Sequence, residues 1–232
     1  MKWLYSGYAV AVSILLLFAL RVIDPTPLQS FRSQVFDSYQ QLDEIAQSKD
    51  VVLINIGEKS LAKYGQYPFP RQNYAQMISD LRNANAGMIG FTIMFPEVDR
   101  FGGDEFFAES LRYGTSILAS FEYPNQIYPK TVGTVIKGPD VGGMLSKGVV
   151  QNTHNLRTNY IQEGISAAPT DVDNLVRRIP LLLKTPDGYV SSFGTEVLKA
   201  LTGARTYIIK TNDNGIQEIS VRGIPPIKTD NL

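Results

Sequence analysis

The chain has 232 residues, of which 44% are hydrophobic and 19% are charged, enough for one substantial core plus a small appendage. Basic and acidic residues number 22 each, and no basic stripe or reading module points to nucleic-acid binding. The absence of cysteine excludes disulfides, thiol nucleophiles and thiolate metal sites. The single histidine, His154, excludes a serine–histidine dyad or a multi-histidine zinc site unless His154 itself takes part.

An apolar segment opens the chain. Trp3–Leu20 runs for about 18 residues without a charge, close to the minimum that spans a bilayer. A cleaved signal peptide is the alternative, but Ala19-Leu20-Arg21 lacks the small-x-small pattern of a cleavage site. We therefore expect residues 1–23 to form a retained signal-anchor transmembrane helix. Asp24–Pro27 ends that helix, and the pattern of Phe31–Ile45 predicts a second, amphipathic helix.

The next segment predicts a strand followed by a short helix. Val51–Ile56 is a β-branched run typical of a strand buried on both faces. Glu58–Tyr64 has helix formers and ends at Gly65. Two prolines then stiffen the loop Tyr67–Arg71, which holds two aromatic rings and a guanidinium.

A helix and a second strand complete a βαβ unit. Apolar residues at helical spacing form one face of the helix: Tyr74, Met77, Ile78 and Leu81. The buried run Met88–Phe95 leads into an acidic loop, Pro96–Asp104. A helix from Asp104 to Gly114 and a strand at Thr115–Phe121 extend the series, whereas Tyr123–Lys147 predicts an inserted loop.

The last third predicts antiparallel hairpins. Turn residues at Thr185–Gly188 and Asp213–Gly215 each separate two apolar runs, and Ser192–Leu201 predicts a helix between the hairpins. That helix carries Phe193, Val197, Leu198 and Leu201 on one face. The fold class is therefore α/β, with a β-α-β-α-β parallel core, added antiparallel hairpins and one preceding N-terminal transmembrane helix.

Four features carry a resemblance to a known family: the strand followed by Glu58, the aromatic-Pro-aromatic-Pro-Arg loop, the Phe91–Phe95 strand, and the Pro96–Asp104 acids. Together they resemble the CHASE domains (cyclases/histidine kinases associated sensing extracellular) of the second class. Phe36-Asp37 matches the start of the family pattern, and the acidic turn Asp171–Asn174 followed by Arg177-Arg178 resembles a second signature.

The resemblance implies that residues 24–232 form an extracytoplasmic ligand-sensing domain of a bacterial transmembrane signalling protein in the inner membrane. The resemblance also implies that binding occurs without turnover, and we expect the cyclase, histidine kinase or similar output module to be absent here. We expect the family's closing section after Leu232 to be missing as well. The implied partners are the lipid bilayer through Trp3–Leu20 and a small polar or anionic ligand. No cofactor or metal is expected, and a homodimer is left open.

Two alternatives of other classes remain. The chain lacks the glycine motifs of nucleotide-binding folds and the Gly-x-Ser-x-Gly elbow, so we expect no catalytic activity. An anchored or secreted periplasmic α/β enzyme would need a nucleophile and a base. A structural envelope domain would need neither.

The ligand site is predicted where parallel strands end, because ligands of open parallel sheets bind outside the carboxyl edge. The candidate ligand-binding residues are Glu58, Tyr67, Phe69, Arg71, Thr92, Asp99, Asp104 and Arg177. Gly57 and Thr92 stand where the resemblance leads us to expect aspartates, which argues against a metal.

Several of these residues have a structural interpretation as well. Arg71 could grip an anionic ligand or pair with a neighbouring acid. Tyr67 and Phe69 could stack on a ligand or fill the core, and the acids, Glu97 included, could bind a cation or cap helices. We expect Arg177 and Arg178 to point in opposite directions, one into the structure. If Arg71 binds ligand, Arg71→Ala abolishes ligand-induced stabilisation with little change in the unliganded melting temperature.

Overall fold

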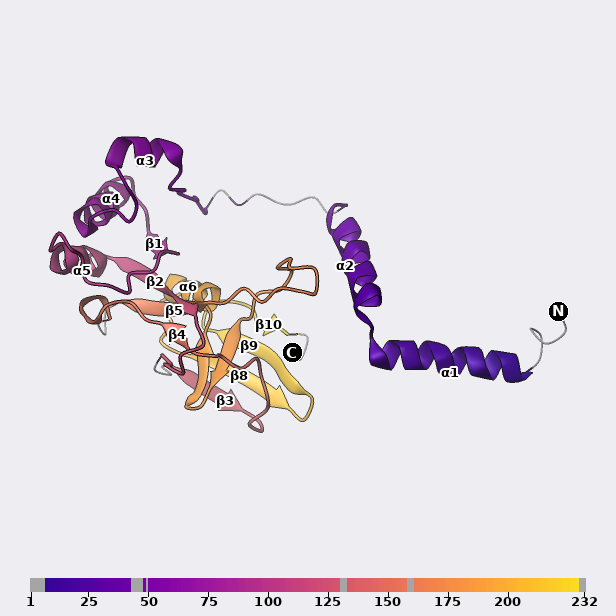
Figure 1. The fold of residues 1–232 in the computed structure, drawn as a ribbon. Coiled ribbons are helices and arrows are strands. Elements are labelled where there is room, and N and C mark those ends of the chain that lie inside the picture. Colours follow the sequence, from indigo (N-terminus) through magenta and orange to yellow (C-terminus); the bar gives the residue numbers. More distant parts are fainter. Residues whose placement is uncertain (1–6, 43–47, 49, 130–132, 158–160, 230–232) are drawn as a thin grey trace. The chain divides into compact units, whose positions relative to one another are not determined.

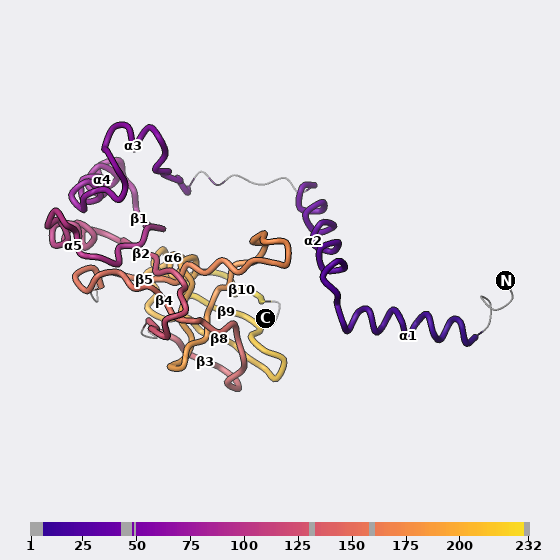
Figure 2. Tube along the Cα trace, in the orientation of Figure 1, coloured from indigo at the N-terminus to yellow at the C-terminus, as the bar shows by residue number. Residues whose placement is uncertain are grey.

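The computed structural model describes residues 7–42, 48, 50–129, 133–157 and 161–229 (Figure 1), and Figure 2 follows the same chain as a tube. The described chain falls into two compact units. The first contains the residues up to 55 together with 169–178, and the second contains 56–168 and 179–232.

Two helices make up most of the first unit. Helix α1 (Gly7–Ile23) ends where the Asp24 amide donates to the Leu20 carbonyl. Helix α2 (Thr26–Gln40) has Pro27 in its first turn, where proline is tolerated because the first N–H groups of a helix have no acceptor within it and proline has no N–H. Among the described residues, no helix alone has the length and hydropathy required of a membrane span, whereas α1 and α2 together meet that test despite an 81° bend. Trp3–Ser6, the start of the predicted anchor, lies outside the described residues, as do 43–45 of the predicted second helix.

The second unit contains a parallel sheet, and two of its strands, β1 (Met88–Phe91) and β2 (Thr115–Glu122), are among the three parallel strands expected from the sequence. Strands β1 and β5 (Gln162–Ser166) both pair in parallel with β2, and the short β4 (Val149–Val150) pairs antiparallel with the end of β2. The helices α3 (Glu58–Tyr64), α4 (Arg71–Asn83) and α5 (Asp104–Arg112) match the predicted helices closely.

Helices cover both faces of this sheet because side chains alternate along a strand. Ile89 and Phe91 of β1 belong to the aromatic core cluster, which also contains residues of α4 and α5. Gly90, between them, lies instead against the ring of Phe193, the first residue of α6 (Phe193–Leu201). Gly164 of β5 approaches the backbone of Phe193. The parallel sheet is therefore the middle layer of an α/β/α sandwich.

A second sheet carries the C-terminal hairpin. Strands β8 (Tyr207–Asn212) and β9 (Gly215–Val221) pair antiparallel, which confirms that hairpin, and β10 (Ile227–Lys228) extends β9. The other predicted hairpin is β6 (Leu182–Thr185) with β7 (Gly188–Ser191). A short 3-10 helix, η2 (His154–Leu156), leaves His154 exposed.

Three local predictions are wrong. Val51–Ile56 forms no strand: the described chain gives this run no pairing partner, and Leu53 is 90% exposed. The strand propensity of a residue reflects how well its side chain packs on a pleated sheet. An apolar run that has no neighbouring strand to pair with therefore does not form a strand. The strand from Met88 ends at Phe91 rather than Phe95. The predicted inserted loop contains β3 (Thr134–Lys137), which pairs in parallel with β8.

The buried face of α6 also differs from the prediction. Thr195, Glu196 and Lys199 are the buried residues of this helix, whereas Leu201 of the predicted apolar face is exposed. Glu196 accepts a hydrogen bond from Ser191 and pairs with Lys199 at 2.7 Å, so each buried charge has a partner.

Gly164→Ala tests the close approach of β5 to α6. An added Cβ would lie 2.6 Å from the Phe193 Cα, and backbone atoms cannot move aside as a flexible side chain can. We expect a loss of about 1–3 kcal/mol in the free energy of unfolding, measured by urea denaturation. Gly142→Ala is the matched control, because that Cβ would meet nothing within 4 Å. Equal stability of the two variants would contradict the packing described.

Candidate functional site

The predicted ligand edge contains a buried arginine at the start of α4. Pro70 precedes the helix and Arg71 is its first residue, with only 7% of its surface exposed. Its Nη2 donates to the Glu97 carbonyl at 3.0 Å, and its Nε lies 3.3 Å from Oδ1 of Asp104. The guanidinium carbon is 4.5 Å from the centre of the Phe95 ring, a cation–π distance. The Arg71 charge is therefore matched inside the protein.

Asp99 and Asp104 complete this cluster by binding backbone amides. One Asp99 carboxylate oxygen accepts from the amides of Arg71 (3.1 Å) and Gly103 (3.0 Å), and Asp104 accepts from the Asp99 amide at 2.7 Å. Burial opposes ionisation of Asp99, but these amide donors and the nearby guanidinium outweigh it and hold the pKa of Asp99 below its usual value. The Arg71 cluster, meaning Arg71, Asp99 and Asp104, thus ties the start of α4 to the loop before α5.

The aromatic rings of the proline loop pack on one another and on Tyr74. The Phe69 ring is 94% buried, and its centre lies 5.9 Å from that of Tyr67 and 6.2 Å from that of Tyr74. Burial raises the pKa of Tyr74 to about 12. Tyr67 is 45% exposed, so it is the ring of this pair that solvent and a ligand can reach.

The structure brings only some of the predicted site residues together. Arg71, Asp99 and Asp104 are in direct contact, and Phe69 reaches them through the aromatic core. Glu58 and Thr92 are exposed, and among the described residues neither forms a hydrogen bond or ion pair with the Arg71 cluster. Arg177 belongs to the other unit. Of the two interpretations of Arg71, pairing with a neighbouring acid is the one observed.

This burial changes the expected effect of Arg71→Ala. Truncation leaves Asp104 with a buried charge and removes the ring contact, so we expect a loss of about 3 kcal/mol in the free energy of unfolding. Arg100→Ala, in the same acidic loop but exposed, is the control and should change stability by less than about 0.5 kcal/mol. Thermal and urea denaturation measure both. If Arg71→Ala were as mild as the control, the cluster would contribute little to the fold.

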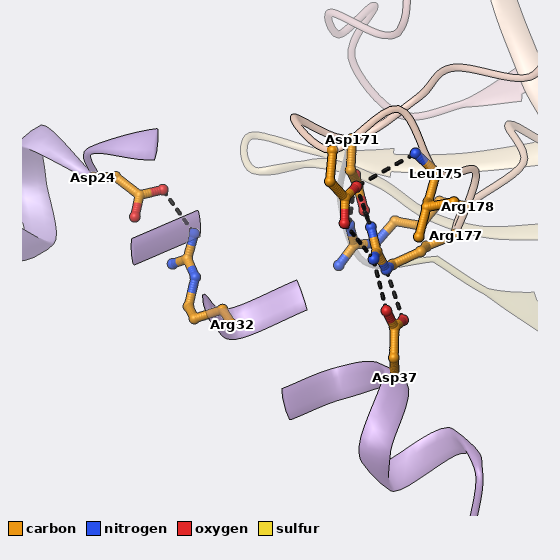
Figure 3. Close-up of polar contacts among 8 residues, drawn as sticks. Asp24, Arg32, Asp37, Asp171, Leu175, Arg177 and Arg178 are labelled. Atoms are coloured by element: carbon orange, nitrogen blue, oxygen red, sulfur yellow. Dashed lines mark hydrogen bonds and ion pairs between the residues drawn. The ribbon is translucent and has the colours of Figure 1, made fainter. Parts of the chain in front are cut away.

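Arg177 is the centre of a second arginine cluster, within the first unit (Figure 3). Its guanidinium binds Asp37 of α2 through two nitrogens, Nε at 2.8 Å and Nη2 at 2.7 Å. It also pairs with Asp171 at 2.9 Å and with Asp173 at 2.6 Å. The Arg177 side chain is 7% exposed, whereas that of Arg178 is 65% exposed and lies 3.8 Å from Asp171. One arginine is therefore buried in the structure and the other is exposed.

The loop before Arg177 is shaped to present these acids. Asn174 adopts a left-handed φ of 62°, its amide donates to the Asp171 carbonyl, and the Leu175 amide donates to the Asp173 carboxylate (Figure 3). We call Asp37, Asp171, Asp173 and Arg177 the Arg177 cluster. Since the guanidinium already lies between three carboxylates, it is saturated by protein partners and is not presented to a ligand.

Sequence reasoning missed Asp37 as the partner of Arg177. The two residues are 140 positions apart, and no spacing rule links them. The available signal was that each of these two residues falls in a segment resembling a family signature.

The sequence analysis also missed Asn152. Its side chain accepts a hydrogen bond from the Phe95 amide and donates one to Glu163 at 2.7 Å. Burial raises the pKa of that Glu163 carboxyl.

Titration of Asp173 tests the Arg177 cluster. The hydrogen bond from Arg177 lowers the pKa of Asp173 to about 2 and also lowers the pKa of Asp37. Because the pKa of Asp173 is lower in the folded chain than in the unfolded chain, the ion pair with Arg177 stabilises the fold fully at pH values above the unfolded-state pKa of about 3.9. This stabilisation is lost as the pH falls toward about 2. An NMR titration of the Asp173 carboxyl carbon should therefore show a midpoint at pH about 2. The midpoint should shift upward in Arg177→Ala and stay unchanged in Arg178→Ala. An ordinary midpoint in the unmodified chain would rule the cluster out.

Comparison with known proteins gives one match. The family model described as CHASE2 domain matches residues 9–230, nearly the whole chain. Searches of curated proteins and of solved structures return no match. A match of this extent, which takes in most of α1 as well as both units, shows that the chain belongs to the CHASE2 domain family, a family of sensory domains of signalling proteins.

Proposed function

We propose that this chain is the extracytoplasmic ligand-sensing part of a bacterial transmembrane signalling protein. The observation that carries the proposal is the family match over residues 9–230. It includes an apolar helix whose large side chains are exposed, among them Leu15, Leu17 and Phe18 at 66%, 66% and 67%. Exposed leucines and phenylalanines in such a run favour lipid as their surroundings.

The anchor and the orientation belong to the same proposal. Trp3–Leu20 is retained as a signal anchor with its N-terminus in the cytoplasm, and residues 24–232 lie outside the inner membrane. The length of the apolar run and the poor cleavage context at Arg21 support retention. Sensory family membership supports binding of a ligand rather than turnover.

The ligand site lies at the exposed side of the Tyr67–Arg71 loop. Tyr67 offers a reachable ring, and Glu58 and Thr92 are exposed candidates for further contacts. A polar or anionic ligand reaches the guanidinium of Arg71 only by replacing one of its present partners. Among these partners, Asp104 is the carboxylate, so a ligand carboxylate or phosphate would compete with Asp104 for the Arg71 guanidinium.

Such an exchange provides a route for signalling. Asp104 is the first residue of α5 and Arg71 the first of α4, so breaking their ion pair releases one helix start from the other. Ligand binding then shifts the population of two arrangements of these helices. The Arg177 cluster serves as a link to α2 rather than as a ligand contact.

Cysteine labelling tests the membrane arrangement, since the native chain contains no cysteine. Lys59→Cys, at an exposed position of α3, should react with a membrane-impermeant maleimide in intact cells. Lys2→Cys should react only after lysis. Labelling of both or neither in intact cells, or a mature N-terminus near Arg21–Asp24, would contradict the proposed anchor.

Tyr67→Ala tests the ligand site. A ligand at about 100 times its dissociation constant stabilises the domain by about 2.7 kcal/mol, which raises the melting temperature by roughly 5–10 °C at about 2–4 °C per kcal/mol. In a thermal-shift screen of small carboxylates and phosphates, the variant should lose this shift while its unliganded melting temperature stays close to normal. Tyr113→Ala, also exposed but at the opposite end of α5, should keep the shift. Equal loss in both variants would place the site elsewhere.

A further inference from the structure

Apolar side chains line one side of α2. At about 100° per residue, five of them fall within an arc of roughly 80°, which we call the α2 stripe: Leu28, Phe31, Val35, Tyr39 and Leu42. Phe31, Tyr39 and Leu42 are 62%, 66% and 78% exposed, and no residue of α2 is buried in the described chain. Most of the α2 stripe is therefore open to whatever surrounds the chain.

The opposite side of α2 is polar and is held by the Arg177 cluster. Ser30, Ser33 and Asp37 lie about 140–160° around the helix from Val35, and all three are half-buried. Asp37 pairs with Arg177 at 2.7 Å (Figure 3). This ion pair turns the polar side of α2 toward residues 171–177 and the α2 stripe away from them.

The 81° bend between α1 and α2 gives the direction of the second helix (Figure 1). A helix that spans a bilayer runs close to the membrane normal, with a tilt of about 20° on average. If α1 spans the membrane, α2 therefore runs roughly along the membrane surface.

The contacts at the bend show which side of α2 is turned toward the end of α1. Arg32 pairs with the Asp24 carboxylate at 2.7 Å, and Gln29 donates to the Asp24 carbonyl at 2.6 Å. Arg32 lies about 20° beyond Tyr39 around the helix, so it borders the α2 stripe. The stripe thus adjoins the side of α2 that faces the end of α1.

The chemistry of α2 suits the boundary between lipid and water. The aromatic rings of Phe31 and Tyr39 favour the level of the lipid headgroups, and the stripe continues the exposed apolar surface of Val22 and Ile23 at the end of α1. The charged residues of α2 are Arg32 and Asp37, and each pairs within the chain. An interfacial position therefore requires no unpaired charge to leave water.

We propose that α2 lies on the outer surface of the membrane, with the α2 stripe in contact with lipid. The proposal rests on the proposed function, because it requires α1 to be the anchor. Helices of this kind bury their apolar side about 5–10 Å into the boundary between headgroups and acyl chains. The Arg177 cluster then joins residues 171–177 to a helix that is fixed at the membrane surface.

Fluorescence quenching in lipid vesicles tests this position of α2. The full-length chain, which has no native cysteine, is labelled with the dye NBD at Val35→Cys or Tyr39→Cys and reconstituted in vesicles of phosphatidylcholine and phosphatidylglycerol. At both positions the dye should be quenched by nitroxide-labelled phosphatidylcholine and protected from aqueous iodide supplied on both sides of the bilayer. Gln40→Cys is the matched control: it is exposed, lies about 140° around the helix from Val35, and should show the reverse pattern.

Two results would overturn the proposal. One is iodide quenching at Val35→Cys as strong as at Gln40→Cys, which would place the stripe in water. The other is protection of Val35→Cys from both quenchers, which would mean that protein, such as a second copy of the chain, covers the stripe.

A charge in the stripe provides a second arm. Val35→Asp added to Tyr39→Cys should weaken quenching by the nitroxide lipid, whereas Gln34→Asp, outside the stripe, should not. Equal effects of the two aspartates would also overturn the proposal. Failure of the anchor would appear separately, because the chain would no longer float with the vesicles in a sucrose gradient, and that result would overturn the proposed function as well.

Discussion

The interaction on which the arrangement of the first unit depends is the guanidinium of Arg177 held between three carboxylates. It joins α2 to a loop 140 residues later in the chain. An arginine withdrawn from water is stable only when its donors are satisfied, and Asp37, Asp171 and Asp173 satisfy them from two segments at once. Removing any of the three leaves the guanidinium with donors that lack a carboxylate. The loop and the helix therefore hold each other in place.

The same chemistry recurs at Arg71, where the partners are different. Arg71 pairs with Asp104 and a backbone carbonyl and stacks on Phe95, while Asp99 binds the amides at the start of α4 and before α5. Both arginines organise helix or loop ends rather than offering a free charge. Under the proposed function, an anionic ligand would act by exchanging an internal partner of Arg71, which couples binding to a change in helix packing.

Much of this fold could be predicted from the sequence because its signals are local. Three features are short-range patterns: the helical spacing of Tyr74 and Ile78, the Asp213-Asn214 turn of the β8–β9 hairpin, and the Gly65 and Ser192 positions at helix ends. The parallel pairing of β1 with β2 followed from the helix between them.

The failures share a different cause. Val51–Ile56 has the composition of a buried strand, but forming one needs a neighbour that composition cannot supply. β3 was hidden among prolines and glycines because its partner, β8, lies about 70 residues later. Glu196 and Lys199 are buried as an ion pair, which the apolar spacing of the helix does not predict. The sequence singled out Arg71, but the burial of Arg71 depends on Asp104 and Phe95, whose positions beside it periodicity cannot predict.

The Asp37–Arg177 ion pair holds α2 against residues 169–178. A double-mutant cycle with Asp37→Asn and Arg177→Gln, read out as hydrogen-exchange protection of the α2 backbone in the full-length chain, tests it most directly. The account predicts that each single variant lowers protection and that the double variant is no worse than Arg177→Gln alone. Additive losses, or singles with unchanged protection, would contradict it.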